Sequence, residues 1–146
     1  PRSILHLEIT ETSLIEKFDF VNQIIDQLLD EQISFKLDDF GTGYSSLAYL
    51  DKVKVSTVKI DKSFLRTASQ EPGPAVEPGS QSNMLNGIIS LGRGLGKMII
   101  AEGVETKAQA ELLWALGCNY CQGYFFGRPG DVETLKKDLR KRRSPQ

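Results

Sequence analysis

The sequence predicts an α/β fold with a parallel β-sheet, in the form of part of a (β/α) barrel. Apolar runs of strand length alternate with stretches of helical periodicity along the 146-residue chain, which favours parallel strands joined by helical crossovers. Polar residues recur at the same end of successive strands, where both (β/α)₈ barrels and open doubly wound sheets bind ligands. Because a full barrel needs about 250 residues, we expect only about its last five strands here, with roughly the first two-fifths of the domain lying outside this chain.

The first half of the chain contains three predicted strands and two predicted helices. The longer helix carries apolar side chains at helical spacing, and Thr12 or Ser13 is expected to cap it. Gly41 and Gly43 mark a turn before the shorter helix. The strands are expected at residues 4–9, 33–37 and 56–60, and the helices at 13–31 and 44–50.

The second half begins with a stretch, residues 66–82, that is rich in Pro, Gly, Ser and Glu. It offers little apolar surface to bury, so a flexible surface loop is predicted there. We therefore divide the chain into a domain portion at 1–130 and a terminal helix with a basic tail at 131–146. The remaining strands are expected at 97–101 and 120–126, and the helices at 83–95, 106–116 and 132–143.

Composition narrows the class of protein. The 18 basic and 19 acidic residues give a net charge of −1, which does not favour a surface for long nucleic acids. No apolar run approaches the ~20 residues that span a bilayer. We expect a cytoplasmic domain, with the cytoplasmic part of a membrane-anchored protein as the alternative. The two cysteines, Cys118 and Cys121, could form a redox or zinc pair, but their place after a helix and a glycine favours packing residues in a reducing compartment.

Polar side chains gather where the predicted strands end. Several carboxylates brought together repel one another unless cations neutralise them. Oxygen ligands without His or Cys suit Mg²⁺ or Mn²⁺, with Ca²⁺ as a competitor. Two Mg²⁺ or Mn²⁺ ions could activate a water and hold a phosphate. The acidic residues are Glu8, Asp38, Asp39 and Glu102, and the other strand-end residues are Lys59, Asp61 and Gln122.

Simpler roles exist for each of these residues taken singly. An Asp at a strand end often caps the next helix or turn, Lys59 could be a solvated charge, and Gln122 could be a hydrogen-bonding scaffold residue. Five successive strands that each deliver a polar group at one end are harder to explain in this way. With a single histidine, His6, a Ser-His-Asp set is excluded. Metal-assisted phosphodiester hydrolysis is therefore favoured over acyl transfer.

Five ordered motifs resemble those of EAL domains. They are LEITE (7–11), DDFGTGYSSL (38–47), KIDKSF (59–64), AEGVET (101–106) and QGYFFGRP (122–129). The resemblance implies a modified TIM barrel that hydrolyses cyclic di-GMP to linear pGpG with Mg²⁺ or Mn²⁺. It also implies cyclic di-GMP as the substrate, a homodimer as one assembly, and sensory or GGDEF domains upstream.

The resemblance also implies roles by position. The metal ligands are Glu8, Asp38, Asp39 and Glu102, with Glu102 alternatively a general base. Lys59 contacts the catalytic water and Gln122 lies near the water and metal, while Glu11 and Glu105 support loops. Arg128 and Pro129 match the closing motif, and no substrate-binding residue is assigned.

The chain departs from the family pattern in its upstream part. The E-A-L-x-R segment, with a metal-binding Glu and a substrate-contacting Arg, and an Asn ligand expected before LEITE are not found within residues 1–146. We therefore expect a phosphodiesterase when the domain is complete and no activity from this chain alone. The alternative is a catalytically incomplete module that binds cyclic di-GMP or a protein partner.

Overall fold

The computed structural model describes residues 5–41, 47–65 and 80–136. Its centre is one five-stranded parallel sheet whose strands follow one another in chain order, β1-β2-β3-β4-β5. The strands are β1 (His6–Thr10), β2 (Ser34–Phe40), β3 (Thr57–Ile60), β4 (Met98–Ala101) and β5 (Tyr120–Cys121). Since a doubly wound sheet reverses its strand order at a switch point, this unbroken order supports an arc of a barrel.

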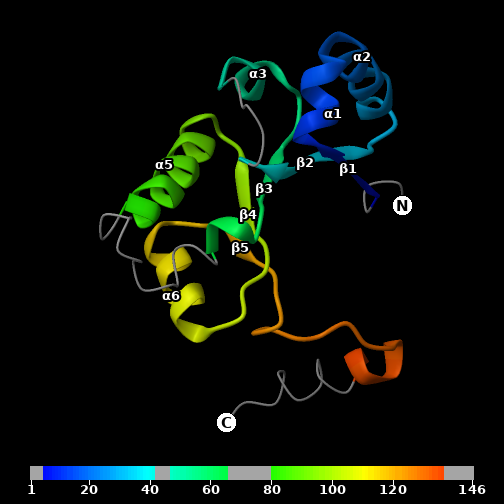
Figure 1. The fold of residues 1–146 in the computed structure, drawn as a ribbon. Coiled ribbons are helices and arrows are strands. Elements are labelled where there is room, and N and C mark those ends of the chain that lie inside the picture. The colour runs from blue at the N-terminus through cyan, green and yellow to red at the C-terminus, as the bar shows by residue number, and fades with distance from the viewer. Residues whose placement is uncertain (1–4, 42–46, 66–79, 137–146) are drawn as a thin grey trace.

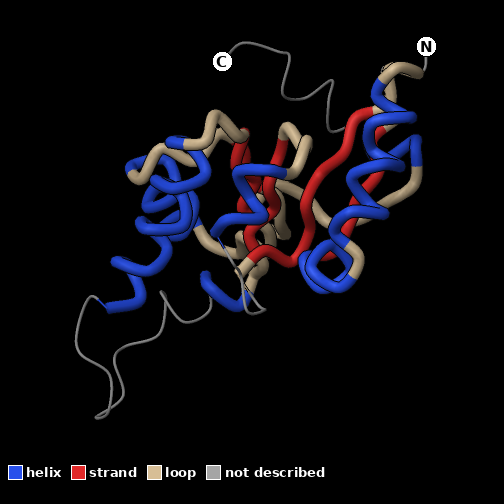
Figure 2. Tube along the Cα trace, turned by 90° about the horizontal axis from the view of Figure 1, so that it is seen from above, coloured by secondary structure: helices blue, strands red, loops and turns tan. Residues whose placement is uncertain are grey.

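The helices pack along the sheet and bury its apolar side chains. They are α1 (Glu11–Glu16), α2 (Phe18–Leu29), α3 (Leu47–Lys52), α5 (Ser80–Gly94) and α6 (Lys107–Ala115). In Figure 1, α1 and α2 lie beside β1 and β2, whereas α5 and α6 lie at the β4–β5 end. The view from above separates these two helical groups with the strands between them (Figure 2). Within the described helices, none is both long and apolar enough to cross a membrane.

The core lies between the sheet and these helices. Alternate strand residues point into it, because successive side chains of a strand face opposite sides. Phe35 and Leu37 of β2 are at most 3% exposed, and Ile99 and Ala101 of β4 are fully buried. Gly92 of α5 permits a close helix–strand approach, since a Cβ there would lie 2.3 Å from the Ile99 side chain.

The prediction of one helix at 13–31 is wrong in two respects. The chain breaks at Lys17, whose φ of −137° is not helical, so α1 and α2 are separate. Thr10, rather than Thr12 or Ser13, is the N-cap of α1, and its hydroxyl accepts a hydrogen bond from the Ser13 N–H. The helix therefore starts at Glu11, which brings that side chain into the first turn.

Other boundaries also differ from the prediction. β2 continues to Phe40 instead of ending at Leu37, and β5 ends at Cys121 instead of running to 126. The first turn of α5, from Ser80, occupies the end of the predicted 66–82 loop. Residues 66–79 and most of the predicted helix at 132–143 lie outside the described residues, although 132–136 are helical.

Candidate functional site

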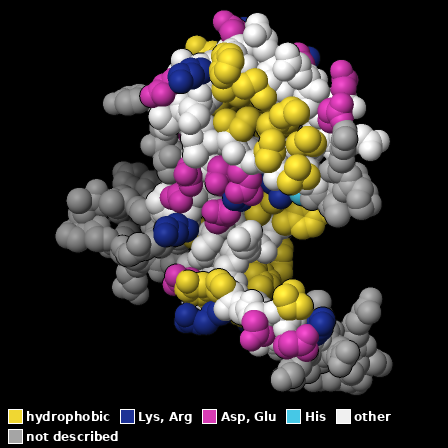
Figure 3. Space-filling model, turned by 90° about the vertical axis from the view of Figure 1, so that its right-hand side faces the viewer, with side chains coloured by type: hydrophobic (Ala, Val, Ile, Leu, Met, Phe, Trp, Pro, Cys, Tyr) yellow, Lys and Arg dark blue, Asp and Glu magenta, His cyan; other side chains and the backbone are white. Residues whose placement is uncertain are grey.

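A lysine surrounded by three carboxylates lies at the carboxyl ends of the strands. The Lys59 Nζ is 2.8 Å from Glu8 Oε2, 2.8 Å from Glu102 Oε1 and 3.0 Å from Asp38 Oδ1. The lysine side chain is only 8% exposed, whereas the carboxylate side chains are 22–42% exposed. Acidic side chains accordingly gather near the centre of the face shown in Figure 3. Three segments distant in sequence thus meet around one ammonium group.

The alternation of side chains along β3 explains why the Lys59 side chain lies on this face of the sheet. Val58 and Ile60 flank Lys59 in β3 and are at most 1% exposed in the helix-covered core. Because side chains alternate along a strand, Lys59 faces the opposite side of the sheet. All four β3 residues are buried, since β3 pairs with β2 on one side and β4 on the other. The lysine is therefore held at the middle of the open face.

The environment of Lys59 keeps its ammonium charged. Burial alone lowers the pKa of a lysine, but hydrogen bonds to Glu102, Glu8 and Asp38 outweigh that effect and raise the pKa well above its usual value. The lysine is thus a fixed cation at neutral pH. Three carboxylates and one ammonium leave a formal charge of −2, which attracts further cations.

A bulge at the end of β2 presents the two adjacent aspartates. The β2–β3 register shifts between Leu37 and Phe40, and Asp39 adopts the left-handed conformation with φ 54°. Its N–H donates to Asp38 Oδ1 at 3.1 Å. Bulges often re-aim side chains beside active sites, and Asp tolerates this conformation better than most residues. The extra residue lets Phe40 return to the core while both carboxylates stay at the strand end.

Glu11 links the start of α1 to the loop after β2. Its side chain is 3% exposed, and its Oε2 accepts a 2.7 Å hydrogen bond from the Gly41 N–H. Gly41 has φ +94°, and a Cβ there would lie 2.6 Å from the Phe64 ring. The carboxylate and the glycine therefore fix the backbone immediately after the aspartate pair.

A pocket of about 250 Å³ opens beside Glu102. The Gln122 backbone closes one side of it, because its N–H donates to the Ala101 carbonyl at 2.8 Å and its carbonyl accepts from the Val104 N–H at 3.0 Å. The Glu105 N–H donates to Gln109 Oε1 at 2.8 Å, as part of the capping region of α6. The pocket is lined by Lys62, Glu102, Gly103, Glu105, Gln122, Gly123 and Tyr124.

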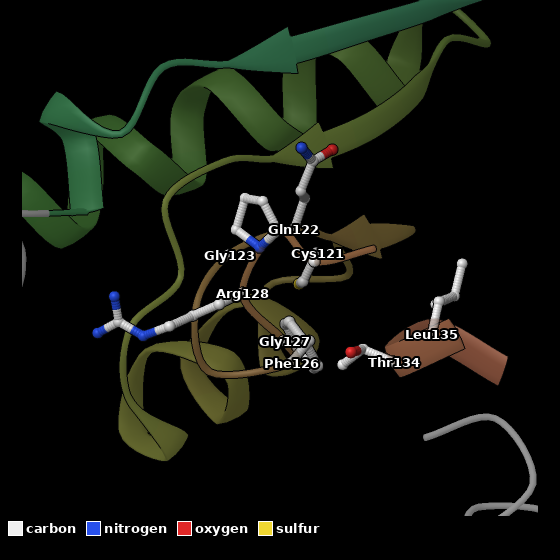
Figure 4. A pocket seen from close by; sticks show the side chains of 10 residues that line it. Cys121, Gln122, Gly123, Phe126, Gly127, Arg128, Thr134 and Leu135 are labelled. Atoms are coloured by element: carbon white, nitrogen blue, oxygen red, sulfur yellow. The ribbon is translucent and has the colours of Figure 1, made fainter. Parts of the chain in front are cut away.

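A larger pocket of about 560 Å³ lies on the other side of Gln122, between β5 and residues 132–136 (Figure 4). Cys121 and Phe126 contribute apolar surface to it. In Figure 4 the Gln122 amide points away from Thr134 and Leu135. Gln122 and Gly123 line both pockets.

The donor set fits a hard divalent cation. Carboxylate oxygens of Glu8, Asp38 and Glu102 already converge on one cationic nitrogen, and all-oxygen ligand sets suit Mg²⁺ or Mn²⁺. Among the described residues, no three His, Cys, Asp or Glu side chains stand in a ready-made metal-binding arrangement. The ammonium lies where their oxygens meet, so a metal ion would have to bind beside Lys59, on the exposed side of these carboxylates.

The structure thus brings four of the sequence-predicted residues into direct contact and places two more nearby. Glu8, Asp38, Glu102 and Lys59 form the contact group, and Gln122 and Glu105 share the adjacent pocket with Glu102. Asp39 adjoins this group through the hydrogen bond from its N–H to Asp38 Oδ1. The sequence did not assign a role to Lys62 or Tyr124, although Lys62 lies in the motif KIDKSF and Tyr124 lies in QGYFFGRP.

Two further sequence features take structural roles. Asp61 Oδ1 accepts from the Ser63 N–H at 2.9 Å, so it caps a turn after β3. Cys118 is buried and Cys121 partly buried, and both are free thiols. Burial, with smaller contributions from Cys118, raises the pKa of Cys121 to about 11, which opposes the reactive thiolate that a redox pair needs.

Comparisons with known proteins agree with this architecture. The family model described as "EAL domain" matches residues 1–129. The chain is 41% identical over 133 residues to the bifunctional diguanylate cyclase/cyclic di-GMP phosphodiesterase MucR of Pseudomonas aeruginosa, covering 91% of this chain and 18% of that protein. It is 39% identical over 125 residues to the cyclic di-GMP phosphodiesterase PdeL of Escherichia coli, covering 86% of this chain and 33% of that protein.

Solved structures show the same fold. The MucR phosphodiesterase in complex with c-di-GMP superposes with a TM-score of 0.82 at 40% identity, covering 92% of this chain and 51% of that one. The EAL domain of Mycobacterium smegmatis DcpA gives 0.80 at 32% identity, covering 99% and 62%. This chain therefore spans between half and two-thirds of those solved chains and a third or less of the two curated relatives. The predicted barrel-type fold is confirmed, and the chain belongs to the EAL domain family.

Proposed function

We propose that this chain forms the metal-binding and catalytic face of a phosphodiesterase that hydrolyses cyclic di-GMP to linear pGpG. The observation that carries the proposal is the convergence of Glu8, Asp38 and Glu102 on Lys59 Nζ within 3.0 Å. Relatives named as cyclic di-GMP phosphodiesterases support the substrate. A carboxylate group of this kind has little use in acyl transfer, but it suits electrostatic stabilisation at a phosphate.

The residues of the group divide two tasks, metal binding and proton transfer, and Glu102 takes part in both. Glu8, Asp38, Asp39 and Glu102 would hold Mg²⁺ or Mn²⁺, in a site for two ions. Such ions, when bound, would polarise the phosphate and increase the acidity of a water. Lys59 keeps the carboxylates in place and presents its ammonium to the attacking water or a phosphate oxygen.

Proton transfer falls to the residues after β4 and β5. Glu102 accepts a proton from the water as its oxygen attacks phosphorus, and Gln122 orients that water by hydrogen bonding. The bond from phosphorus to one ribose 3′ oxygen breaks, and that oxygen takes up a proton from solvent. One cleavage of this kind opens the ring and leaves linear pGpG.

A second candidate function is a module that binds cyclic di-GMP or a protein partner without hydrolysing the nucleotide. The observation that favours it is that Lys59 already neutralises part of the carboxylate charge. A cluster balanced in this way can persist without a metal ion. Hydrolysis and binding assays on the same preparation separate the two functions.

The test compares Asp38→Asn with Asp26→Asn in the complete domain. Asp26 lies on α2 in an exposed ion pair with Lys54, so it controls for the loss of one carboxylate. After treatment with chelator, wild type and Asp26→Asn should recover cyclic di-GMP hydrolysis on addition of Mn²⁺ or Mg²⁺, whereas Asp38→Asn should not. Hydrolysis by Asp38→Asn without added metal would contradict the proposal. Tight binding with no turnover by the wild type would favour the module.

The remaining proposals concern partners, the activity of residues 1–146 alone and the cellular compartment. The outer edges of β1 and β5 pair with no described strand, and unpaired edges invite association. Homodimers or upstream domains are therefore proposed partners. We also expect residues 1–146 by themselves to be inactive, because the metal-binding Glu and substrate-contacting Arg that the family resemblance implies are not found within them. Because both cysteines are free thiols, we propose the cytoplasm as the reducing setting. Equal specific activity of this chain and the complete domain would contradict the expectation of inactivity.

A further inference from the structure

Lys36 lies in the middle of β2, on the face of the sheet opposite the helices. Its neighbours Phe35 and Leu37 are at most 3% exposed in the helix-covered core. Because side chains alternate along a strand, Lys36 faces the open side together with Asp38. Two strand residues span about 7 Å, so Lys36 lies one layer below the carboxylate group, toward the amino ends of the strands. Its side chain is partly buried there.

The Lys36 ammonium has no hydrogen bond or ion pair with any residue that the structure describes. Glu8 is level with it in the register of β1 and β2, but Glu8 Oε2 accepts from the Lys59 ammonium at 2.8 Å. Asp38 and Glu102 contact the same Lys59 ammonium, at 3.0 Å and 2.8 Å. The carboxylates nearest to Lys36 are therefore already engaged by another lysine.

The same face of the sheet exposes large apolar side chains. Met98 of β4 is 42% exposed and Tyr120 of β5 is 58% exposed. Ile99, next to Met98, is fully buried in the helix-covered core, so Met98 points to the open side. Tyr120 is level with Ile100, which has the same parity as Met98. Exposed apolar surface of this extent marks a place where another segment packs.

The strand order indicates which element covers this face. The strands form an arc in the order β1-β2-β3-β4-β5, and the outer edges of β1 and β5 pair with no described strand. The matched region is 51% of the MucR chain and 62% of the DcpA chain, so both contain residues beyond it. In a ring of eight strands, the strand opposite β2 is the one that pairs with the outer edge of β5, and side chains fill the interior between them.

We propose that the open face binds a strand from the part of the barrel outside residues 1–146, and that an inward-pointing Asp or Glu of this strand pairs with Lys36. The inference goes beyond the proposed function, because this pair lies below the metal-binding and catalytic residues. A lysine enclosed by the closing strands needs a counter-charge, since an unpaired buried ammonium is strongly unfavourable. The other inward residues of the strand are apolar, to match Met98 and Tyr120.

Thermal unfolding of the complete domain tests this pair through the direction of the change in Tm. Lys36→Met keeps much of the side-chain volume and removes the cation, which leaves the partner carboxylate enclosed without a counter-charge. We expect Tm to fall by about 5–10 °C. If Lys36 were enclosed without an acceptor, the same substitution would raise Tm, and if water solvated it, Tm would not change.

The matched control is Lys107→Met. Lys107 forms an exposed ion pair with Glu111 at 3.2 Å on α6, so its removal should lower Tm by no more than about 2 °C.

Reductive methylation of the wild-type domain with formaldehyde gives a second measurement that needs no variant. A lysine covered by other strands reacts only when the structure opens, so Lys36 should be modified at least about tenfold more slowly than Lys107. Mass spectrometry of the digested protein quantifies both sites. This measurement decides the enclosure of Lys36 even if Lys36→Met does not fold.

A crystal structure of the complete domain identifies the partner. We expect a carboxylate from outside residues 1–146 within about 4 Å of the Lys36 Nζ. Changing that Asp or Glu to its amide should lower Tm about as much as Lys36→Met, and the double variant should lose less than the sum of the two.

Three results would overturn the inference: a Tm that is unchanged or raised in Lys36→Met, methylation of Lys36 as fast as that of Lys107, or a structure in which Glu8 is the only carboxylate beside Lys36. None of these measurements uses hydrolysis. A domain that hydrolyses cyclic di-GMP but gives one of these results keeps the proposed function and refutes the pair. An inactive domain with the expected Tm, methylation and structure keeps the pair and refutes the proposed hydrolysis.

Discussion

Replacing Lys59 by methionine tests whether its ammonium organises the carboxylate group. The side chain is 8% exposed and contacts three carboxylates within 3.0 Å. Methionine has a similar length and no charge, so Lys59→Met keeps much of the volume and removes only the cation. The formal charge of the group changes from −2 to −3, with the three carboxylates left to repel one another.

The loss of unfolding free energy that we expect for Lys59→Met lies between two limits. Breaking a fully buried ion pair by removing one partner costs about 3–5 kcal/mol, whereas exposed pairs contribute about 0–1 kcal/mol. Here the lysine is buried, but the carboxylates are 22–42% exposed and partly screened by water. We therefore expect a loss of about 2–3 kcal/mol in unfolding free energy. For a domain of this size that is a fall in Tm of about 5–10 °C.

The matched control is Lys54→Met. Lys54 pairs with Asp26 at 2.7 Å, but both side chains are at least half exposed. Its removal should lower Tm by no more than about 3 °C. Thermal unfolding of the complete domain, followed by circular dichroism after chelator treatment, measures both variants under the same conditions.

A metal titration extends the test. The more negative group in Lys59→Met should bind a divalent cation at least as well as wild type, and an ion at 100 times its Kd adds about 2.7 kcal/mol. Mn²⁺ should therefore restore much of the lost Tm, while cyclic di-GMP hydrolysis stays low because the ammonium is gone. A Lys59→Met variant that melts within 1 °C of wild type, or that Mn²⁺ does not stabilise, would refute this reasoning.

Three other perturbations have outcomes that follow from single contacts. Gly123→Ala should destabilise the domain by about 2–3 kcal/mol and reduce turnover, because its Cβ would overlap the backbone of the loop after β4; Gly127→Ala, with open space around it, should be near neutral in the same melting and activity assays. Glu11→Ala should cost about 2 kcal/mol in chemical denaturation, since it removes the buried charged acceptor of the Gly41 N–H, and an unchanged midpoint would argue against that link. Cys121, with its pKa raised to about 11 by burial, should react with iodoacetamide at pH 8 on the order of 10²-fold more slowly than a free thiol. Because the folded protein keeps this proton, stability should decline as pH rises above about 8.5, the pKa of an exposed thiol, and a rapid reaction at pH 8 or a flat profile up to pH 10 would contradict the assignment.

The sequence alone predicted the alternation of strands and helices, and it singled out the residues that meet around Lys59. Hydrophobic periodicity is a local property, so β3 and β4 were located to within a residue. Acidic residues after apolar runs predicted a carboxylate group, because parallel strands place their carboxyl ends on one side. The family resemblance followed from five local motifs, and the match over residues 1–129 confirmed it.

Boundaries were less predictable where distant backbone segments set them. The aromatic run after Gln122 looks like a continuing strand, yet β5 ends at Cys121 because Gly123 packs against Val104. Nothing local marks the bulge that extends β2 past the two aspartates, since it depends on pairing with β3. The N-cap of α1 lay two residues earlier than the nearer predicted cap, Thr12, because Thr10 ends β1 and begins the helix at once.

Only the tertiary structure decided how the strands are ordered and what lies between the carboxylates. Five parallel strands are equally compatible with a barrel and a doubly wound sheet until their pairing is known, and the order β1-β2-β3-β4-β5 selects the barrel type. In the same way, Lys59 could have been a solvated charge. It became the centre of the site because β3 lies in the middle of the sheet and its pairing with neighbouring strands brings in Glu8, which is 51 residues away in the sequence. Such contacts form only when the sheet closes over long chain separations, and no local pattern encodes them.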